Sequence, residues 1–216
     1  MHWEKKHFKF NNAPPLLFTK KEKKIQDIIV EHGREFSVEK GYNFSLCGDD
    51  KGHVFYVNRG YVSLEESEKK SIIKFFPSPL LIGIREHKIQ INLSYRALSI
   101  CKGYFIKKDF FLKKIKTDNL CLSLAEYIGE YCDEIIKSYA LIHGENSYSM
   151  IKQCIIELHM LPVNIRKEIS LANYIIKRTN LSRSGVMRII SDLCTGKYIE
   201  MRNGKLESIR HLPQAY

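Results

Sequence analysis

The period of the hydrophobic pattern changes along this chain of 216 residues, and the change separates two kinds of architecture. Between residues 34 and 106, short apolar runs such as Tyr42–Leu46 and Val54–Val57 alternate with turns. Many short strands at a spacing of about 8–12 residues are typical of an antiparallel sandwich or jelly roll. From about residue 119 the apolar residues recur with a helical period instead. The pattern predicts an α+β chain in which a β-sandwich over residues 34–118 is followed by helices.

A long helix is predicted over residues 119–143, because apolar positions there repeat at alternating spacings of three and four. The repeated positions are Cys121, Leu124, Ile128, Tyr131, Ile135, Ser138 and Ile142. This spacing is the heptad seam along which two helices pair. We therefore expect a homodimer held by Leu124, Ile128, Tyr131, Ile135 and Ile142. A second apolar side, formed by Ala125, Cys132 and Tyr139, would then lie on the sandwich. The alternative is an ordinary core helix within one subunit.

The first 33 residues are predicted to form a basic arm that leads into a short helix. Up to residue 24 the arm carries seven lysines against two glutamates. The whole chain has 35 Lys and Arg against 24 Asp and Glu, which gives a formal charge of +11. An excess that large favours a polyanionic partner, with nucleic acid ahead of an anionic membrane. The arm itself is either a solvated tail or a segment that contacts a nucleic-acid backbone.

Several classes of protein are not indicated by the sequence. The longest apolar stretch, Phe75–Ile84, is broken by prolines and a glycine, and it is shorter than the ~18 residues of a membrane span. The N-terminus leads into no apolar signal region, so we expect a cytoplasmic protein. The six cysteines are scattered without a CxxC pair, which disfavours structural zinc or an iron–sulfur cluster. We find no nucleophile–base–acid set and no phosphate-binding loop, and we therefore expect neither an enzyme nor a metal or cofactor site.

The segment Ser170–Ile209 carries the pattern with the clearest functional meaning. Apolar residues on two predicted helices flank Asn180, at the positions Ile175, Leu181, Val186 and Ile189. In a helix-turn-helix, apolar residues at this spacing lock the two helices at a steep angle. The turn requires a positive φ, for which Asn is the most tolerant residue after Gly. The sequence therefore predicts a helix-turn-helix whose second helix runs from about Ser182, its N-cap, to Leu193.

The second of these helices is predicted to expose basic and polar residues in its first turns. A recognition helix reads base edges in the major groove with its N-terminal residues, and Arg can grip guanine with two hydrogen bonds. Cations around it suit phosphate anchoring. The predicted DNA-binding residues are Lys177, Arg178, Ser182, Arg183, Ser184, Arg188, Arg202 and Lys205. The last two flank Asn203-Gly204, which predicts a hairpin turn. A hairpin directly after a helix-turn-helix is a wing, so residues 147–216 are predicted to form a winged helix-turn-helix.

A β-sandwich, a long helix and a C-terminal winged helix, in this order and length, resemble the CRP/FNR family of bacterial transcription regulators. The resemblance covers about residues 36–209, and it is carried by Val57–Leu64, similar to a family hairpin, and by Leu181–Arg188, similar to the recognition helix. It implies a cyclic-nucleotide-binding-like sandwich, a homodimer, double-stranded DNA with an imperfect palindrome, and RNA polymerase as a further partner. It also implies base and phosphate contacts for Arg183, Ser184 and Arg188, although many members carry Glu where Ser184 stands. Within the family the sequence is most similar to the enterobacterial inhibitor-of-peroxide-resistance type.

The residues that hold a cyclic nucleotide in that family are replaced in this chain. Binders carry Gly-Glu and an apolar residue, then Arg-Ser/Thr-Ala, whereas the matching positions read Gly83-Ile84-Arg85 and Ile91-Asn92-Leu93. Ile84 cannot accept a ribose hydroxyl and Ile91 cannot pair with a phosphate. Arg96 lies five positions after Ile91, and an odd offset in a strand directs it to the opposite face. We therefore predict that the sandwich binds neither cyclic AMP nor cyclic GMP.

Two alternatives stay open at this point. A non-catalytic protein-interaction module with a degenerate winged helix would have the same architecture without binding DNA. For sensing, Cys47 lies beside a turn and Cys101 precedes Lys102, and a nearby cation can activate a thiol toward oxidation. Buried, unreactive cysteines are the default in a reduced compartment.

Overall fold

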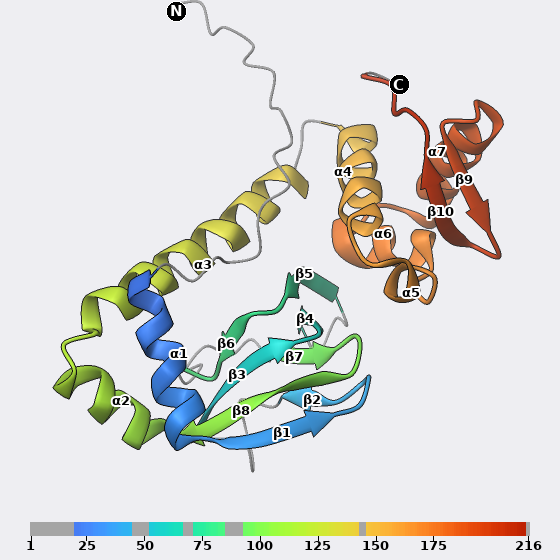
Figure 1. Cartoon of the computed structure of the whole chain (residues 1–216). Coiled ribbons are helices and arrows are strands. Elements are labelled where there is room, and N and C mark those ends of the chain that lie inside the picture. The colour runs from blue at the N-terminus through green and yellow to red at the C-terminus, as the bar shows by residue number, and fades with distance from the viewer. Residues whose placement is uncertain (1–19, 45–51, 67–70, 85–92, 143–145, 215–216) are drawn as a thin grey trace, which may run out of the picture.

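The structure is a computed structural model, and it describes residues 20–44, 52–66, 71–84, 93–142 and 146–214 (Figure 1). Along these residues a short helix leads into a β-sandwich, a second short helix and a long helix follow, and a small helical domain with a two-stranded hairpin comes last. The α+β architecture predicted from the sequence is confirmed. Among the described residues, no helix is long and apolar enough to span a membrane.

Two antiparallel sheets form the sandwich. One has the order β1 (Arg34–Val38), β8 (Cys101–Lys107), β3 (His53–Arg59) and β6 (Leu80–Ile82). The other has the order β2 (Asn43–Phe44), β7 (Leu93–Ala97), β4 (Tyr61–Glu66) and β5 (Ser71–Pro77). Apolar side chains of both inner faces pack between the sheets, among them Phe44, Phe55 and Phe76. The rings of Phe44 and Phe55 meet edge to face, with their centroids 5.5 Å apart.

A glycine makes the tight turn between β3 and β4 possible. Gly60 has φ +122°, a conformation that side chains rarely adopt. A Cβ atom at this position would lie 2.6 Å from the Cys101 sulfur and 2.8 Å from the Ile100 carbonyl oxygen. The turn predicted around Gly60 is therefore present, and it packs against the start of β8.

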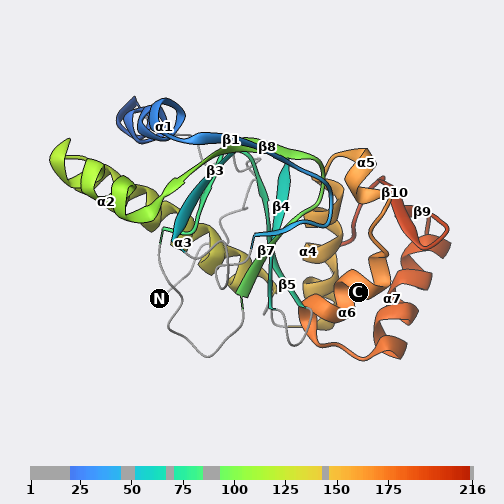
Figure 2. The same ribbon diagram turned by 90° about the horizontal axis from the view of Figure 1, so that it is seen from below.

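Helices α1 (Lys20–His32) and α2 (Lys108–Thr117) cover the end of the sandwich that lies away from the C-terminal domain (Figures 1 and 2). Ile25 and Ile29 of α1 and Phe111 of α2 are fully buried in one cluster. The short helix predicted within the first 33 residues is present as α1, whereas α2, with Phe111 and Ile115 as its buried residues, was not predicted. The basic arm before residue 20 lies outside the described residues.

Helix α3 (Cys121–Ile142) packs on the sandwich with the face that the sequence analysis assigned to a second subunit. Leu124 is 8% exposed. The Tyr131 ring stacks on Phe76 with centroids 5.0 Å apart, and Ile135 packs against the same core. Leu124 is therefore buried within one chain, and Tyr131 and Ile135 are partly buried against the sandwich, so the face expected to pair with a second copy packs on the sandwich instead. Ile128 is 40% exposed at the edge of this face, and the side chain of Ile142 lies outside the described residues.

The opposite face of α3 is exposed and has a heptad spacing of its own. Its residues, which we name the α3 stripe, are Leu122, Ala125, Gly129, Cys132, Ile136 and Tyr139. Leu122, Ile136 and Tyr139 are 67%, 63% and 62% exposed, respectively. The residues predicted to lie on the sandwich, Ala125, Cys132 and Tyr139, all belong to this stripe. The face expected to lie on the sandwich is thus the exposed one.

The C-terminal domain consists of α4 (Ser147–His159), α5 (Val163–Arg166), α6 (Leu171–Thr179), α7 (Arg183–Thr195) and the hairpin β9 (Ile199–Arg202) and β10 (Lys205–Ile209). Its core draws apolar residues from every one of these elements, including Ile151, Ile155, Leu158, Ile175 and Leu206. Helix α4 is capped by the Asn146 side chain, which accepts a hydrogen bond from the Ser149 N–H at 2.8 Å. The domain therefore has a hydrophobic core of its own.

Candidate DNA interface

The turn between α6 and α7 is built as the sequence predicts. Asn180 has φ +58°, in the left-handed region, and its N–H bonds to the Ile176 carbonyl at 3.1 Å. The Thr179 hydroxyl donates to the Ile175 carbonyl at 2.7 Å and accepts from the Leu181 N–H at 3.3 Å. Thr179 thus satisfies backbone groups at the turn, a role that the sequence analysis missed. The helix-turn-helix around Asn180 is confirmed.

Helix α7 turns one apolar face to the core and one polar face to solvent. The buried residues are Val186, Ile189, Ile190 and Leu193. Ser182 caps the helix, because its Oγ accepts a hydrogen bond from the Gly185 N–H at 3.2 Å. Arg183, Ser184 and Arg188 are exposed to solvent. The predicted N-cap is confirmed, and the exposure agrees with base reading, which stays a prediction.

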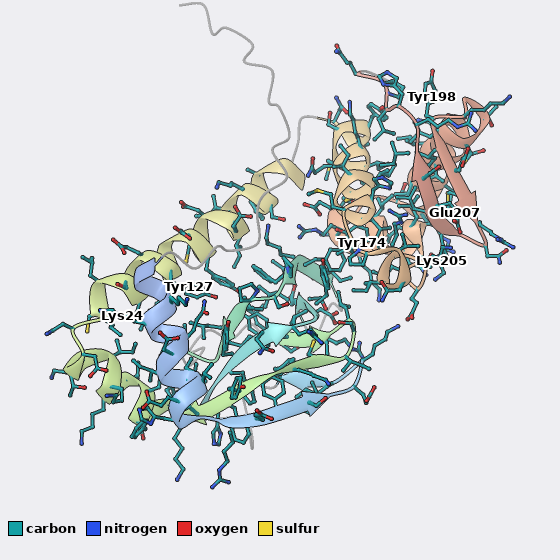
Figure 3. All side chains as sticks on the ribbon, in the orientation of Figure 1. Lys24, Tyr127, Tyr174, Tyr198, Lys205 and Glu207 are labelled. Atoms are coloured by element: carbon teal, nitrogen blue, oxygen red, sulfur yellow. The ribbon has the colours of Figure 1, made fainter. Side chains whose placement is uncertain are left out.

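The hairpin of β9 and β10 has the geometry of a wing. Asn203 and Gly204 have φ +51° and +74°, the pair of positive values that a two-residue Asn-Gly turn adopts. Arg202 is exposed beside the turn. The Lys205 ammonium donates to the Glu168 carbonyl at 2.7 Å, so its charge is drawn toward the segment before α6; Figure 3 labels Lys205 on the hairpin. The predicted wing is confirmed; of its two cations, Lys205 bonds to the backbone, whereas Arg202 is exposed.

Arg178 does not reach solvent, and its assignment to DNA is wrong. The side chain is 6% exposed. Its guanidinium donates to the Ile72 carbonyl at 3.1 Å and to the Ser138 hydroxyl at 2.6 Å, and it lies 3.6 Å from the Glu157 carboxylate. These partners come from β5, α3 and α4, which enclose the guanidinium and leave no room for a phosphate. Lys177, one residue earlier, is exposed and keeps its predicted role.

The contacts of Arg178 belong to a network that joins the C-terminal domain to the sandwich and to α3. The Glu157 carboxylate accepts hydrogen bonds from the Tyr174 hydroxyl at 2.8 Å and from the Ser138 hydroxyl at 3.3 Å. The Tyr174 ring lies 5.2 Å from the Phe75 ring of β5. Burial raises the pKa of Tyr174 well above its ordinary value, and the negative charge of Glu157 adds to this shift. We name Ile72, Ser138, Glu157, Tyr174 and Arg178 the Arg178 network.

On β7, Arg96 points outward from the sandwich, as predicted. Its side chain is 55% exposed and lies 3.9 Å from Glu65, while its neighbours Tyr95 and Ala97 are buried. The Tyr95 hydroxyl instead meets the Tyr131 hydroxyl of α3 at 2.5 Å. Burial raises the pKa of Tyr95 to about 12. The replaced positions Arg85 and Ile91 lie outside the described residues.

The structure supports the interpretation of Cys101 as a buried, unreactive cysteine. This thiol is fully buried, and burial raises its pKa although its hydrogen bonds with Tyr61 and Ser99 oppose the shift. A buried thiol with a raised pKa is a poor nucleophile. Cys47, the other candidate, lies outside the described residues. Among the described residues, no group of three or more His, Cys, Asp or Glu side chains could hold a metal ion.

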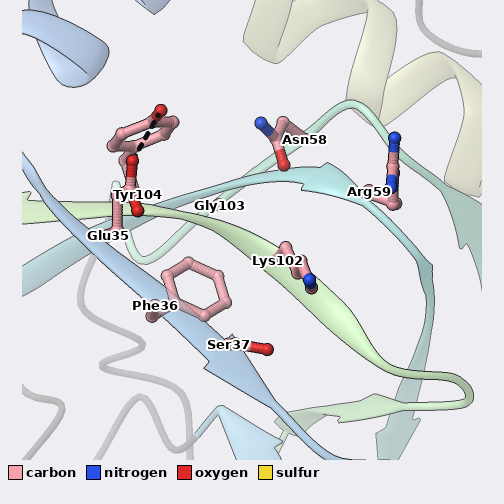
Figure 4. A pocket seen from close by; sticks show the side chains of 8 residues that line it. All are labelled: Glu35, Phe36, Ser37, Asn58, Arg59, Lys102, Gly103 and Tyr104. Carbon is pink, nitrogen blue, oxygen red and sulfur yellow. Dashed lines mark hydrogen bonds between the residues drawn. The ribbon is translucent and has the colours of Figure 1, made fainter.

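A shallow groove of about 460 Å³ crosses the outer face of β1, β8 and β3 (Figure 4). Glu35 and Tyr104 lie at one end, joined by a 3.3 Å hydrogen bond, and Arg59 and Lys102 lie at the other. The lining therefore combines both signs of charge. No residue of the predicted DNA interface contributes to it.

Comparisons with known proteins agree with this geometry. Residues 147–214 match the family model described as winged helix-turn-helix DNA binding. The inhibitor of hydrogen peroxide resistance from Escherichia coli K12 is 30% identical over 186 residues, which cover 84% of this chain and 88% of that protein. The protein of the same name from Salmonella typhimurium LT2 is 28% identical over 203 residues, covering 89% of this chain and 94% of that protein.

Solved structures show the same fold at low sequence identity. The c-di-GMP-responsive global regulator CLP of Xanthomonas campestris matches with a TM-score of 0.67 and 14% identity, over 88% of this chain and all of that chain. A CRP/FNR-family regulator from Eubacterium rectale matches with a TM-score of 0.65 and 15% identity, over 93% and 95% of the two chains. These matches are regulators rather than enzymes, as the sequence predicts. The C-terminal domain thus matches winged helix-turn-helix DNA binding, the chain has the fold of CRP/FNR-family regulators, and it belongs to the family of the inhibitor of hydrogen peroxide resistance.

Proposed function

We propose that this protein is a dimeric, sequence-specific transcription regulator that inserts residues 182–193 into the major groove of DNA. The observation that carries the proposal is that α7 exposes Arg183 and Arg188 while its apolar residues are buried in the core. A helix divided in this way is held by its domain on one side and can read base edges with the other. The name of the relatives suggests that the regulated genes affect resistance to hydrogen peroxide.

The proposed roles of the contacting residues follow from their position and chemistry. Arg183, in the first turn of α7, would grip a guanine with two hydrogen bonds, while Ser184 and Arg188 would contact neighbouring bases or phosphates. Lys177 and Arg202 are exposed cations on either side of α7 along the sequence, and they would anchor phosphates. Ser182 would place the start of α7 against the backbone. Lys205 stays in the proposal as a weaker contact, since its ammonium already bonds to Glu168.

The proposed dimer uses the α3 stripe in place of the seam expected from the sequence. Six small or apolar residues at alternating spacings of three and four are exposed along one side of α3. Burying such a seam against a second copy removes apolar surface from water. Two recognition helices held about 34 Å apart read an imperfect palindrome. We include RNA polymerase as a further partner.

In this proposal the chain keeps the parts predicted from its sequence: the arm and short helix at 1–33, the sandwich at 34–118, the dimer helix at 119–143 and the winged helix at 147–216. We propose that the sandwich binds no cyclic nucleotide. The outward orientation of Arg96 supports this, since no arginine is brought to the inner face of β7.

The test is a DNA-binding titration with fragments selected from a random-sequence pool. We expect the protein to enrich an imperfect palindrome and to bind it with steep salt dependence, because phosphate contacts release counterions. Arg183→Ala should lose about tenfold in affinity for the selected sequence, with a much smaller change on unrelated DNA. Lys113→Ala, which removes an exposed charge from α2, is the matched control.

Three outcomes would contradict the proposal. Failure to enrich any sequence would favour the protein-interaction module with a degenerate winged helix. Equal losses for Arg183→Ala on all sequences would move Arg183 from base to phosphate contact. An effect of Lys113→Ala as large as that of Arg183→Ala would assign binding to the overall charge.

A further inference from the structure

Met187 is an exposed apolar side chain on the polar face of the recognition helix. It is 47% exposed, whereas Val186, Ile189, Ile190 and Leu193 of the same helix are buried. It lies four residues after Arg183 and directly before Arg188, so one helical turn places it between the two arginines. Every residue of α7 is described, and Met187 is its one large apolar residue on the solvent side.

The part of Met187 that is open to solvent can be covered by a partner. Leu181, Cys194 and Met201 are partly buried and pack against the core of the C-terminal domain, whereas Met187 is 47% exposed. A partner that covers this exposed apolar surface removes it from water, which is favourable. Such a partner approaches the solvent side of α7, where Arg183 and Arg188 are also exposed.

We propose that Met187 determines sequence specificity by contacting the 5-methyl group of a thymine in each half-site. This inference rests on the proposed function, because it requires α7 to lie in the major groove. Thymine presents the one methyl group on the floor of that groove, and apolar side chains read it by contact. Methionine suits this task, since its unbranched thioether adapts its shape to the surface that it meets.

The position of Met187 also predicts where the thymine lies. Four residues of helix advance about 6 Å along the axis at 1.5 Å per residue, and stacked base pairs are about 3.4 Å apart. Met187 is therefore expected to meet a base pair about two steps from the one that Arg183 reads. The half-site should contain a guanine for Arg183 and a thymine about two positions away, on either strand.

The experiment replaces thymines by deoxyuridine, which removes only the methyl group. A palindromic fragment selected by the wild-type protein is prepared with one thymine replaced at a time, in both half-sites together. We expect one position at which this change weakens wild-type binding by about fourfold for each methyl group, the effect of leaving one methyl uncovered. Met187→Ala should bind the thymine and deoxyuridine fragments equally at that position, and Met187→Leu should still distinguish them.

Controls separate this inference from the proposed function. Arg183→Ala should remain sensitive to deoxyuridine at the Met187 position while losing its preference for guanine. The proposal is overturned if Met187→Ala shows the same deoxyuridine penalties as the wild type at every position, or if the wild type shows none. If the wild type enriches no sequence from the pool, the proposed function fails and this inference fails with it. An unchanged midpoint of thermal unfolding for Met187→Ala shows that the variant is folded.

Discussion

At the scale of single residues, Ser182 combines two roles that a substitution can separate. Its hydroxyl caps α7, and it stands at the helix end that we place against DNA. Ser182→Asp keeps a cap of similar strength, because Asp and Ser rank together at this position, but its charge would repel phosphates. We expect the free energy of unfolding in urea to change by less than about 0.5 kcal/mol, while DNA affinity at low salt falls about tenfold.

Ser182→Ala is the matched control for this pair of effects. It removes the cap without adding charge, so it should lower the free energy of unfolding by about 1 kcal/mol and weaken DNA binding less than Ser182→Asp does. If Ser182→Asp binds DNA as tightly as the wild type, the start of α7 does not approach the phosphates.

Local chemistry made part of the site predictable. Asn180 and Ser182 follow from rules that concern a residue and its near neighbours, namely tolerance of positive φ and N-capping. The polar face of α7 follows from the apolar spacing on its other side. Arg178 could not be predicted in this way, since the Ile72 carbonyl that it bonds lies 106 positions away. Its burial is set by the packing of two domains.

At the scale of elements, α3 shows what a periodic pattern leaves undetermined. Two stripes of this helix have heptad spacing, so period alone cannot tell which one faces the sandwich. Specific contacts decide it: Tyr131 meets Tyr95 and stacks on Phe76, and Lys74 of β5 pairs with Glu134 at 3.1 Å. These partners lie in the sandwich. Which face of α3 they fit can be seen only when the fold of the strands is known.

The α3 stripe makes a direct prediction about the oligomeric state. Ile136→Asp places a charge in the centre of the proposed dimer seam, at a residue that is 63% exposed in one chain. Each dimer would lose two apolar contacts and bury two carboxylates, so we expect the dissociation constant to rise at least about a hundredfold. Sedimentation equilibrium measures this directly.

Leu112→Asp is the control, because Leu112 is also an exposed apolar residue, 40% exposed on α2, but lies outside the stripe. It should leave the association unchanged. A wild-type mass for Ile136→Asp at all concentrations would assign the dimer to another surface.

At the scale of the whole molecule, the Arg178 network ties the DNA-binding domain to the rest of the chain. Arg178→Met keeps the alkyl packing but removes the cation, which leaves the Glu157 carboxylate without its charged partner. Removing one member of a buried pair typically costs about 3 kcal/mol. We expect a loss of this size in the free energy of unfolding, and a C-terminal domain that is digested faster by proteases.

Lys177→Ala is the neighbouring control. This cation is exposed on the same helix, so its removal should change stability by less than about 0.5 kcal/mol. Equal stabilities of the Arg178→Met and Lys177→Ala variants would show that the network does not couple the two parts of the chain.

The Arg178 network has a consequence for how chains of this kind diverge. A substitution in β5, α3 or α4 that removes a partner of this guanidinium leaves a buried cation unpaired. Tolerated substitutions at these positions must therefore be accompanied by a compensating substitution. Sequence change in the sandwich and in α3 is thereby restrained by Arg178, a residue of the C-terminal domain. Chimaeras that exchange one domain between distant relatives should accordingly be unstable unless the residues of the Arg178 network are exchanged together with it.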